Sequence, residues 1–404
     1  MMDREEIARV EVGQTNVSAG VARALVGWFL LMLVVLPVVE LVAQPRTVWD
    51  HLARIPDRIE GGLFAANRAV LEGFNAFETA LDDQSAVGRA LRPQTQRVLS
   101  GWLGAGNERV YIGRDGWLFY RPDVEYVTGR GFLDQRQMDR RVAAAREFET
   151  VPQPDPRPAI RRFKRDLEAR GITLVLLPTP VKPTIHAKQM AGIDDAPQNL
   201  SYGAFIDELR GDGVLVFEPS REMQYLVTDT HWRPEAMQRV AEALVVFLDE
   251  NVRLQPAASP GYTSERREAR NTGDTAAMLD LPKDQTLYPQ ERVTLRFIVD
   301  RAGDPWRSSR DADVLLLGDS FTNMYSLPTM GWGEAAGFAE QLSYTLQRPL
   351  DRIVQNDDGA YATREILRRE SGGPSDRLAG KRVVIWQFAA RELAFGDWKV
   401  IDIP

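Results

Sequence analysis

The chain has 404 residues, of which 44% are hydrophobic and 26% charged, and its formal net charge is −7 at pH 7. This length and composition indicate a globular protein with a sizeable buried core, and the lack of a basic tract argues against nucleic acid as a partner. No cysteine is present, which excludes disulfides, thiol nucleophiles and cysteine-ligated zinc. Because only three histidines occur (His51, His186 and His231), we expect no histidine-rich metal site.

The first predicted element is a membrane-spanning helix over residues 24–43. No charge interrupts the chain between Arg23 and Glu40, and the interval approaches the ~20 apolar residues that a bilayer span needs. A buried core helix would normally keep a polar stripe, which this run lacks. We therefore expect an uncleaved signal-anchor; the alternative is a cleaved signal peptide ending at Ala43, although Leu41 fits a small-residue cleavage site poorly. Arginines lie on both sides of the span, so the positive-inside rule does not fix its orientation.

Residues 44–104 are predicted to form an amphipathic helical stalk, because apolar residues recur there at spacings of three and four. Segment 110–120 is predicted to be a β-hairpin, since β-prone residues flank an Asp-Gly turn. A charged helix is expected near 134–149. The run 151–158 is predicted to be a loop or connector, because four prolines in eight residues disfavour both a helix and a central strand.

From residue 159 onward, short apolar runs alternate with helical patterns. This alternation predicts an α/β domain with a mainly parallel sheet and helices on both faces. Residues 252–292 show little periodicity, and we expect an insertion or lid over the site there. The expected strands are 172–177, 214–217, 293–299, 314–317, 352–355 and 383–388, and the expected helices are 159–170, 234–250, 334–346 and 363–369.

The best candidate nucleophile is Ser320, in the run Gly318-Asp-Ser that directly follows the strand predicted at 314–317. Ligands of parallel sheets bind at the carboxyl ends of the strands. A serine at that edge lies beside backbone N–H groups that can stabilise an oxyanion, which suits acyl transfer. The plainer interpretation is a serine that only caps a helix.

The candidate base is His231, in Asp229-Thr-His-Trp232. A serine hydroxyl needs an imidazole base, which in turn is oriented by a carboxylate. An aspartate two residues before the histidine can bond Nδ1 and leave Nε2 free to face the serine. The alternative makes Asp229 a helix cap and His231 a surface residue. Of the other histidines, His51 lies in the predicted stalk and His186 has no acidic neighbour close in sequence.

The order and spacing of the two motifs resemble the alginate O-acetyltransferase AlgJ/AlgX family. In most SGNH hydrolases the Asp/His pair follows the serine and is spaced Asp-x-x-His, whereas here it precedes the serine and is spaced Asp-x-His. The family's SGNH hydrolase-like domain is circularly permuted in this sense. Residues 112–126 resemble its opening segment, and residues 384–393 with Gly396-Asp-Trp398 resemble its closing one. The likeness covers roughly residues 105–404 and implies a flavodoxin-like SGNH domain.

By this resemblance, Ser320 carries the acetyl group, His231 acts as general base and acid, and Asp229 orients the imidazole. The acceptor would be a hydroxyl of an alginate-like exopolysaccharide, and the acetyl donor an AlgI-like membrane-bound O-acyltransferase. The chain would then be a single-pass inner-membrane protein with residues 1–23 in the cytoplasm and the catalytic domain in the periplasm. No cofactor is implied.

The asparagine that completes most SGNH oxyanion holes has no clear match. Asn356 and the Gly359 N–H are candidates for that role, and Tyr325 and Arg391 are candidate substrate contacts that could equally be structural. Two alternatives to the transferase stay open. One is a carbohydrate acetylesterase in which water takes the acyl group from the same triad. The other is a non-catalytic scaffold of a polysaccharide modification and secretion complex.

Overall fold

The computed structural model describes residues 18–43, 67, 71, 73, 85–145, 150–356, 359–373 and 376–404. The chain divides into two compact units, residues 1–95 and 96–404. Most of the predicted stalk and the first 17 residues of the chain therefore lie outside the described part.

The first unit contains helix α2 (Ala19–Ala43) and the beginning of α5 (Ala86–Trp102). Among the described residues, one helix is long and apolar enough to cross a membrane: the interval Ala19–Glu40 has 22 residues and a mean hydropathy of 2.3. The Glu40 carboxylate accepts hydrogen bonds from the N–H groups of Ala86 and Val87 at the start of α5. A negative charge at a helix N-terminus is stabilised by the helix dipole.

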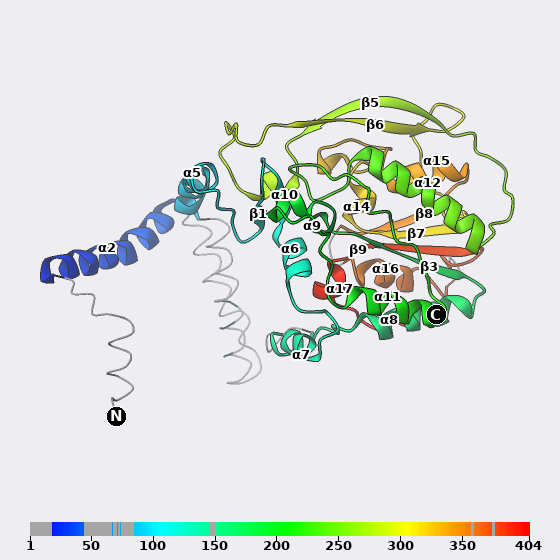
Figure 1. Ribbon diagram of the computed structural model, residues 1–404, viewed down its shortest axis with the longest axis horizontal. Coiled ribbons are helices and arrows are strands. Elements are labelled where there is room, and N and C mark those ends of the chain that lie inside the picture. The colour runs from blue at the N-terminus through cyan, green and yellow to red at the C-terminus, as the bar shows by residue number, and fades with distance from the viewer. Residues whose placement is uncertain are drawn as a thin grey trace. The chain divides into compact units, whose positions relative to one another are not determined.

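The second unit is built on a five-stranded, wholly parallel sheet in the order β4-β3-β9-β7-β8 (Figure 1). The predicted parallel sheet is therefore confirmed, and each of its strands lies within a residue or two of its predicted position. Its strands are β3 (Thr173–Thr179), β4 (Leu215–Val216), β7 (Val314–Gly318), β8 (Asp351–Val354) and β9 (Val383–Ala389).

The strand order shows the circular permutation. Counted from β7, which leads into Ser320, and continuing through β8 and β9 to β3 and β4, the spatial order is 2-1-3-4-5. That is the flavodoxin-like order, whose ligands bind where the strand order reverses, between the first and third strands. Ser320 follows β7, so it lies at this switch point beside β9.

Two hydrophobic layers sandwich the sheet, because its central strands β3, β9 and β7 bury both faces. Leu315 and Leu317 of β7 face one layer, and Val314 and Leu316 face the other. Helices α12 and α15 cover the latter face, and α8, α11 and α16 the former (Figure 1). Those five helices span Pro234–Asn251, Phe338–Leu346, Pro156–Glu168, Tyr202–Gly211 and Ala362–Arg369, respectively.

The proline-rich run departs from its prediction. Helix α8 begins at Pro156, inside the segment predicted to be a loop, with Pro156 and Pro158 in its first turn and Asp155 as N-cap. Proline is tolerated in the first turn because the N–H groups there have no intrahelical partner. The remaining helices of this unit are short: α6 (Arg121–Thr128), α7 (Gln135–Ala143), α9 (Lys182–Ile185), α10 (Ala187–Ala191), α13 (Asp274–Met278), α14 (Ser320–Asn323), η2 (Pro328–Met330) and α17 (Glu392–Phe395).

Two antiparallel ribbons complete the second unit. The predicted hairpin is present as β1 (Val110–Ile112) and β2 (Leu118–Tyr120). The predicted strand at 293–299 lies in β6 (Glu291–Val299), which pairs along its whole length with β5 (Thr263–Asn271). Part of segment 252–292, predicted to be an insertion or lid, therefore forms strand β5 and the short helix α13.

Candidate active site

Ser320 opens the short helix α14 at the carboxyl end of β7, where the backbone turn is held by Asp319. One oxygen of the Asp319 carboxylate accepts the Phe321 N–H at 2.9 Å and the Gln387 amide at 2.8 Å, and the other accepts the Ala389 N–H at 2.7 Å. Asp319 thus ties the turn to β9, the neighbouring strand. Ser320 is 9% exposed and lies at the open edge of the sheet.

His231 lies on the loop that leads from β4 to α12. An isolated antiparallel bridge between Tyr225 and Trp232 closes this loop, and the hydroxyl of Tyr325 donates to the Trp232 carbonyl at 2.8 Å. The ring of His231 packs against Phe321, with centroids 4.7 Å apart. These contacts fix the imidazole beside the start of α14.

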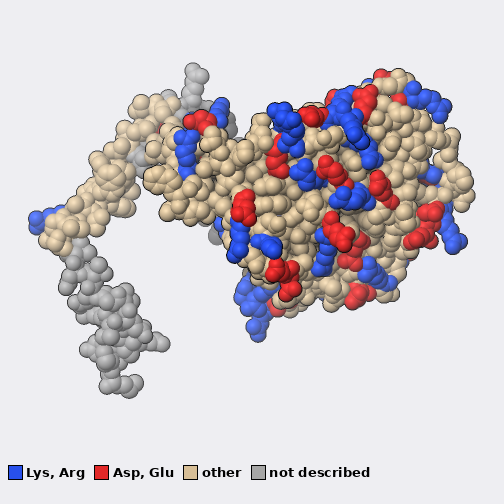
Figure 2. Space-filling view, turned by 45° about the horizontal axis from the view of Figure 1, so that its top comes forward, with Lys and Arg blue, Asp and Glu red and all other residues tan. Residues whose placement is uncertain are grey.

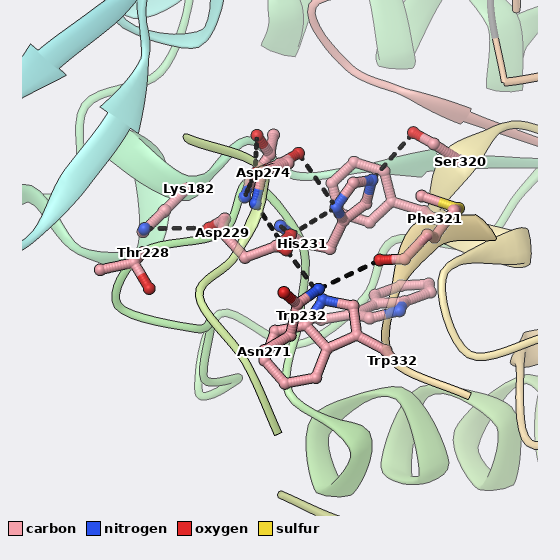
Figure 3. Close-up of polar contacts among 12 residues, drawn as sticks. Lys182, Thr228, Asp229, His231, Trp232, Asn271, Asp274, Ser320, Phe321 and Trp332 are labelled. Carbon is pink, nitrogen blue, oxygen red and sulfur yellow. Dashed lines mark hydrogen bonds and ion pairs between the residues drawn. The ribbon is translucent and has the colours of Figure 1, made fainter. Parts of the chain in front are cut away.

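The three residues predicted to form the triad converge in one hydrogen-bonded chain (Figure 3). His231 Nε2 lies 2.9 Å from Ser320 Oγ, and Nδ1 lies 2.7 Å from an oxygen of Asp229. Asp229 and His231 are buried, at 2% and 3% exposure, so the serine is the member most open to a substrate. This is the geometry of a nucleophile, a base and an orienting carboxylate.

The second oxygen of Asp229 has two donors of its own. Trp332 Nε1 donates to it at 2.9 Å, and the Asp274 N–H at 3.1 Å (Figure 3). Burial raises the pKa of the Asp229 carboxyl, but hydrogen bonds and charge from His231 and the bond from Trp332 outweigh burial and lower the pKa to about 2. Asp229 is therefore ionised at neutral pH.

A second carboxylate, Asp274, also faces the imidazole. Its Oδ2 lies 3.5 Å from His231 Nδ1, and its Oδ1 accepts the Thr230 N–H at 2.7 Å. Burial and the charge of Asp229 raise the pKa of Asp274 to about 6. Burial alone would lower the pKa of His231, yet the hydrogen bond and charge of Asp229, with the charge of Asp274, leave it raised.

Among the described residues, Asp229, His231 and Asp274 form a group whose ligand atoms lie within 4.8 Å of one another. A cation could in principle be held there. However, Nδ1 already bonds Asp229, and the carboxylate oxygens of both aspartates accept protein N–H groups. The cluster is accounted for as two carboxylates around one imidazole.

Lys182 supports the same loop by hydrogen bonds to its backbone. Its ammonium group is fully buried and donates to the carbonyl oxygens of Leu118, Val227 and Asp229. Burial lowers the pKa of Lys182 to about 8. The hairpin strand β2 is thereby joined to the backbone that carries the candidate base.

The residues predicted to contact the oxyanion or the substrate lie at different distances from Ser320. Tyr325 is completely buried and its hydroxyl donates to the Trp232 carbonyl, so it supports the histidine loop, and a substrate contact there stays a prediction. Asn356 is exposed, and its amide oxygen accepts from Asn323 rather than reaching Ser320. Gly359 lies beside the nucleophile turn, since a Cβ built on it would be 3.4 Å from Asp319 Cβ.

Arg391 follows β9 and lies close to the triad. Its guanidinium donates to the buried Asp123 at 3.0 Å and lies over the rings of Tyr120 and Phe321, at 5.2 and 5.9 Å. Its charge also opposes protonation of His231. Arg391 remains a candidate for contact with a bound substrate, because its side chain keeps 14% exposure.

Comparison with known proteins identifies the family of this chain. Residues 110–390 match the family model described as the SGNH hydrolase-like domain of the acetyltransferase AlgX. The chain belongs to this family. The AlgX-type domain therefore covers the whole sheet and all three converging residues.

Similar proteins include two named probable alginate O-acetylase AlgJ. The one from Pseudomonas aeruginosa PAO1 is 24% identical over 352 residues, covering 83% of this chain and 84% of that protein. The one from Pseudomonas putida KT2440 is 24% identical over 308 residues, covering 71% of each. The solved O-acetyltransferase domain of Pseudomonas putida AlgJ has the same fold, with a TM-score of 0.53 and 20% identity over 71% of this chain and 93% of that one.

Three residues of this AlgX-type site were not predicted from the sequence. Asp274, Trp332 and Lys182 lie outside the two motifs, and only the Gly-Asp pair at 273–274 offered a signal, because a glycine before a polar residue marks a turn. His186 is not part of this group of residues: its Nε2 accepts the Tyr225 N–H, and burial lowers its pKa to about 4. His51 lies outside the described residues.

Proposed function

We propose that the chain is an O-acetyltransferase that moves an acetyl group through a Ser320 acyl-enzyme to hydroxyls of an alginate-like exopolysaccharide. The proposal rests mainly on the hydrogen-bonded chain from Ser320 Oγ through His231 to Asp229. It is supported by membership of an acetyltransferase family and by similarity to proteins named alginate O-acetylases.

In the first step, Ser320 Oγ attacks the carbonyl carbon of the acetyl donor while His231 Nε2 takes the hydroxyl proton. Asp229 stabilises the imidazolium, which then gives the proton to the leaving group. In the second step, an acceptor hydroxyl loses its proton to the same nitrogen and attacks the acyl carbon. The proton returns to Ser320 as the ester bond to the enzyme breaks, so the enzyme is regenerated.

The oxyanion formed in both steps needs donors near Ser320. The Phe321 N–H is already bonded to Asp319 and is not available. The Ser320 N–H has no acceptor among the residues that the structure describes. We propose the N–H groups of Ser320 and Gly359 as the donors, in preference to the Asn356 side chain.

We further propose that α2 anchors the chain in the inner membrane, with the acetyltransferase domain on the periplasmic side. An AlgI-like membrane-bound O-acyltransferase would supply the acetyl group there, as the resemblance implies. Protease treatment of intact spheroplasts is the test of this placement. Digestion of the domain is expected, and protection of the domain would contradict it.

To test the activity, the full chain is incubated with a chromogenic acetyl ester and an oligouronate acceptor. Mass spectrometry then measures whether the oligouronate has gained acetyl groups. The proposal expects acetylated oligouronate from the wild type and none from Ser320→Ala. Release of acetate with no acetylated acceptor would instead identify an acetylesterase. If an active-site acylating probe leaves Ser320 unlabelled in folded protein, the chain is a scaffold and the proposal fails.

A further inference from the structure

The β5–β6 ribbon carries an unfavourable arrangement of charge. In its antiparallel register, Arg266 lies directly opposite Arg296, and Arg270 directly opposite Arg292. Like charges at directly opposite positions destabilise a strand pair. Side chains alternate between the faces of a ribbon, so all four arginines lie on one face.

Two of these four arginines have an acidic partner, each at a distance beyond that of a hydrogen bond. Arg292 lies 3.6 Å from Glu268, and both side chains are more than half exposed. Arg296 lies 3.8 Å from Glu242 of α12. The guanidinium groups of Arg266 and Arg270 make no hydrogen bond or ion pair within the part of the chain that the structure describes. Figure 2 shows basic side chains, interspersed with acids, on the face that carries the ribbon.

A groove runs along this face between the ribbon and helices α12 and α15. Its volume is about 500 Å3, which is within the usual range for a ligand site. Arg296 is held in place there by the amide oxygen of Gln238, at 2.9 Å, and by the ring of Tyr344, at 5.4 Å. The remaining lining is mostly polar: Glu235, Ser264, Arg266, Thr294 and Leu295.

The ribbon ends at the candidate active site. At the end of β5, the Thr272 carbonyl accepts the hydroxyl of Thr228, which precedes the triad aspartate. At the start of β6, Glu291 accepts the Thr228 N–H. The Arg270–Arg292 pair is therefore close to the triad loop, and the Arg266–Arg296 pair lies four residues farther out, about 13 Å along the strand.

We propose that this face of the ribbon, defined by Arg266, Arg270, Arg292 and Arg296, binds a stretch of polysaccharide that carries carboxylates and directs it to Ser320. Guanidinium groups recognise carboxylates with paired hydrogen bonds, and the charge of such a chain offsets the repulsion between opposed arginines. This inference rests on the proposed function and deepens it, because it names the residues that bind the acceptor's carboxylates and the path of the acceptor to Ser320.

The test compares Arg266→Gln/Arg270→Gln with Arg267→Gln. Arg267 lies on the same strand but on the opposite face, where its guanidinium stacks on Phe297 and pairs with Glu265. Acetyl transfer from a chromogenic ester is measured with an oligouronate and with its carboxyl-reduced, neutral counterpart. For the double variant we expect KM for the oligouronate to rise on the order of tenfold relative to KM for the neutral acceptor. Added salt should narrow this difference, and Arg267→Gln should resemble the wild type.

A second measurement keeps the two proposals separable. Calorimetry measures binding of the oligouronate to two variants: Ser320→Ala alone, and Ser320→Ala combined with Arg266→Gln and Arg270→Gln. Melting curves confirm that each variant folds. Equal oligouronate binding by both chains overturns the ribbon proposal, even if transfer by the wild type stands. Loss of binding without any wild-type transfer would support the ribbon as a uronate site while the proposed transferase activity fails.

Discussion

Replacing Gly273 by alanine tests whether close packing between two loops sets the activity. Gly273 immediately precedes Asp274, and its backbone has φ +88° and ψ 157°. A Cβ there would lie 2.2 Å from the Thr228 carbonyl oxygen and 3.0 Å from the Asp229 nitrogen. The substitution therefore drives a side chain into the backbone that carries Asp229.

The size of the effect follows from these distances. Real Cβ atoms stay beyond 3.0 Å from backbone atoms, so the two segments must separate by about 1 Å. Displacement of that size in a catalytic group lowers rates on the order of 10²-fold. The positive φ adds a strain of about 1–3 kcal/mol, which lowers the free energy of unfolding.

Gly303 supplies the matched control. Its φ is +87°, almost the same as that of Gly273, but a Cβ built on it has nothing within 4 Å. Both alanine variants should lose stability in a thermal melt because of the positive φ, whereas kcat for a chromogenic acetyl ester should fall about 10²-fold only in Gly273→Ala. If folded Gly273→Ala keeps the kcat of Gly303→Ala, loop spacing does not control the site and the reasoning is refuted.

Three further predictions concern the groups around the imidazole. Because the base must be neutral and the pKa of His231 is raised, kcat/KM should fall as pH drops through a value above the ordinary pKa of imidazole. Asp274→Asn removes a charge that raises the pKa of His231, so the acid limb of the kcat/KM profile should move to lower pH. An acid limb that does not move would contradict this electrostatic role of Asp274. Trp332→Phe removes a donor to the Asp229 carboxylate and should lower the free energy of unfolding in urea by about 1.5–3 kcal/mol; no change would show that the bond is unimportant. Tyr325→Phe leaves the buried Trp232 carbonyl without its donor and should lower the free energy of unfolding by about 1 kcal/mol. KM for an oligouronate acceptor should stay constant, and a raised KM would indicate that Tyr325 contacts the substrate.

The sheet and the contact between Ser320 and His231 could be predicted from the sequence because they depend on strong local patterns. Strands buried on both faces, such as β7 and β9, read as continuous apolar runs that few other elements imitate. The convergence of Ser320 and His231 followed from the rule that functional residues gather at strand ends, together with the family resemblance.

The residues that support Asp229 and His231 could not be predicted from the sequence because tertiary packing determines their positions. Trp332 lies in an irregular segment between η2 and α15, and nothing near it in sequence indicates that its ring nitrogen reaches Asp229. Strand β5 was missed for a related reason: eight of its nine residues are polar and most are exposed, so it lacks the apolar alternation by which strands are recognised. Its partner β6, with buried Val293 and Leu295, was predicted.

The central position of strand β9 has a particular consequence for folding. β9 lies between β3 and β7, so it joins the half of the sheet that carries the histidine to the half that carries the serine. A nascent polypeptide lacking residues 383–389 has two separate strand pairs and no continuous sheet. Deletion of residues 383–389 would therefore leave Ser320 and His231 in the polypeptide but remove the strand that brings their two halves of the sheet together.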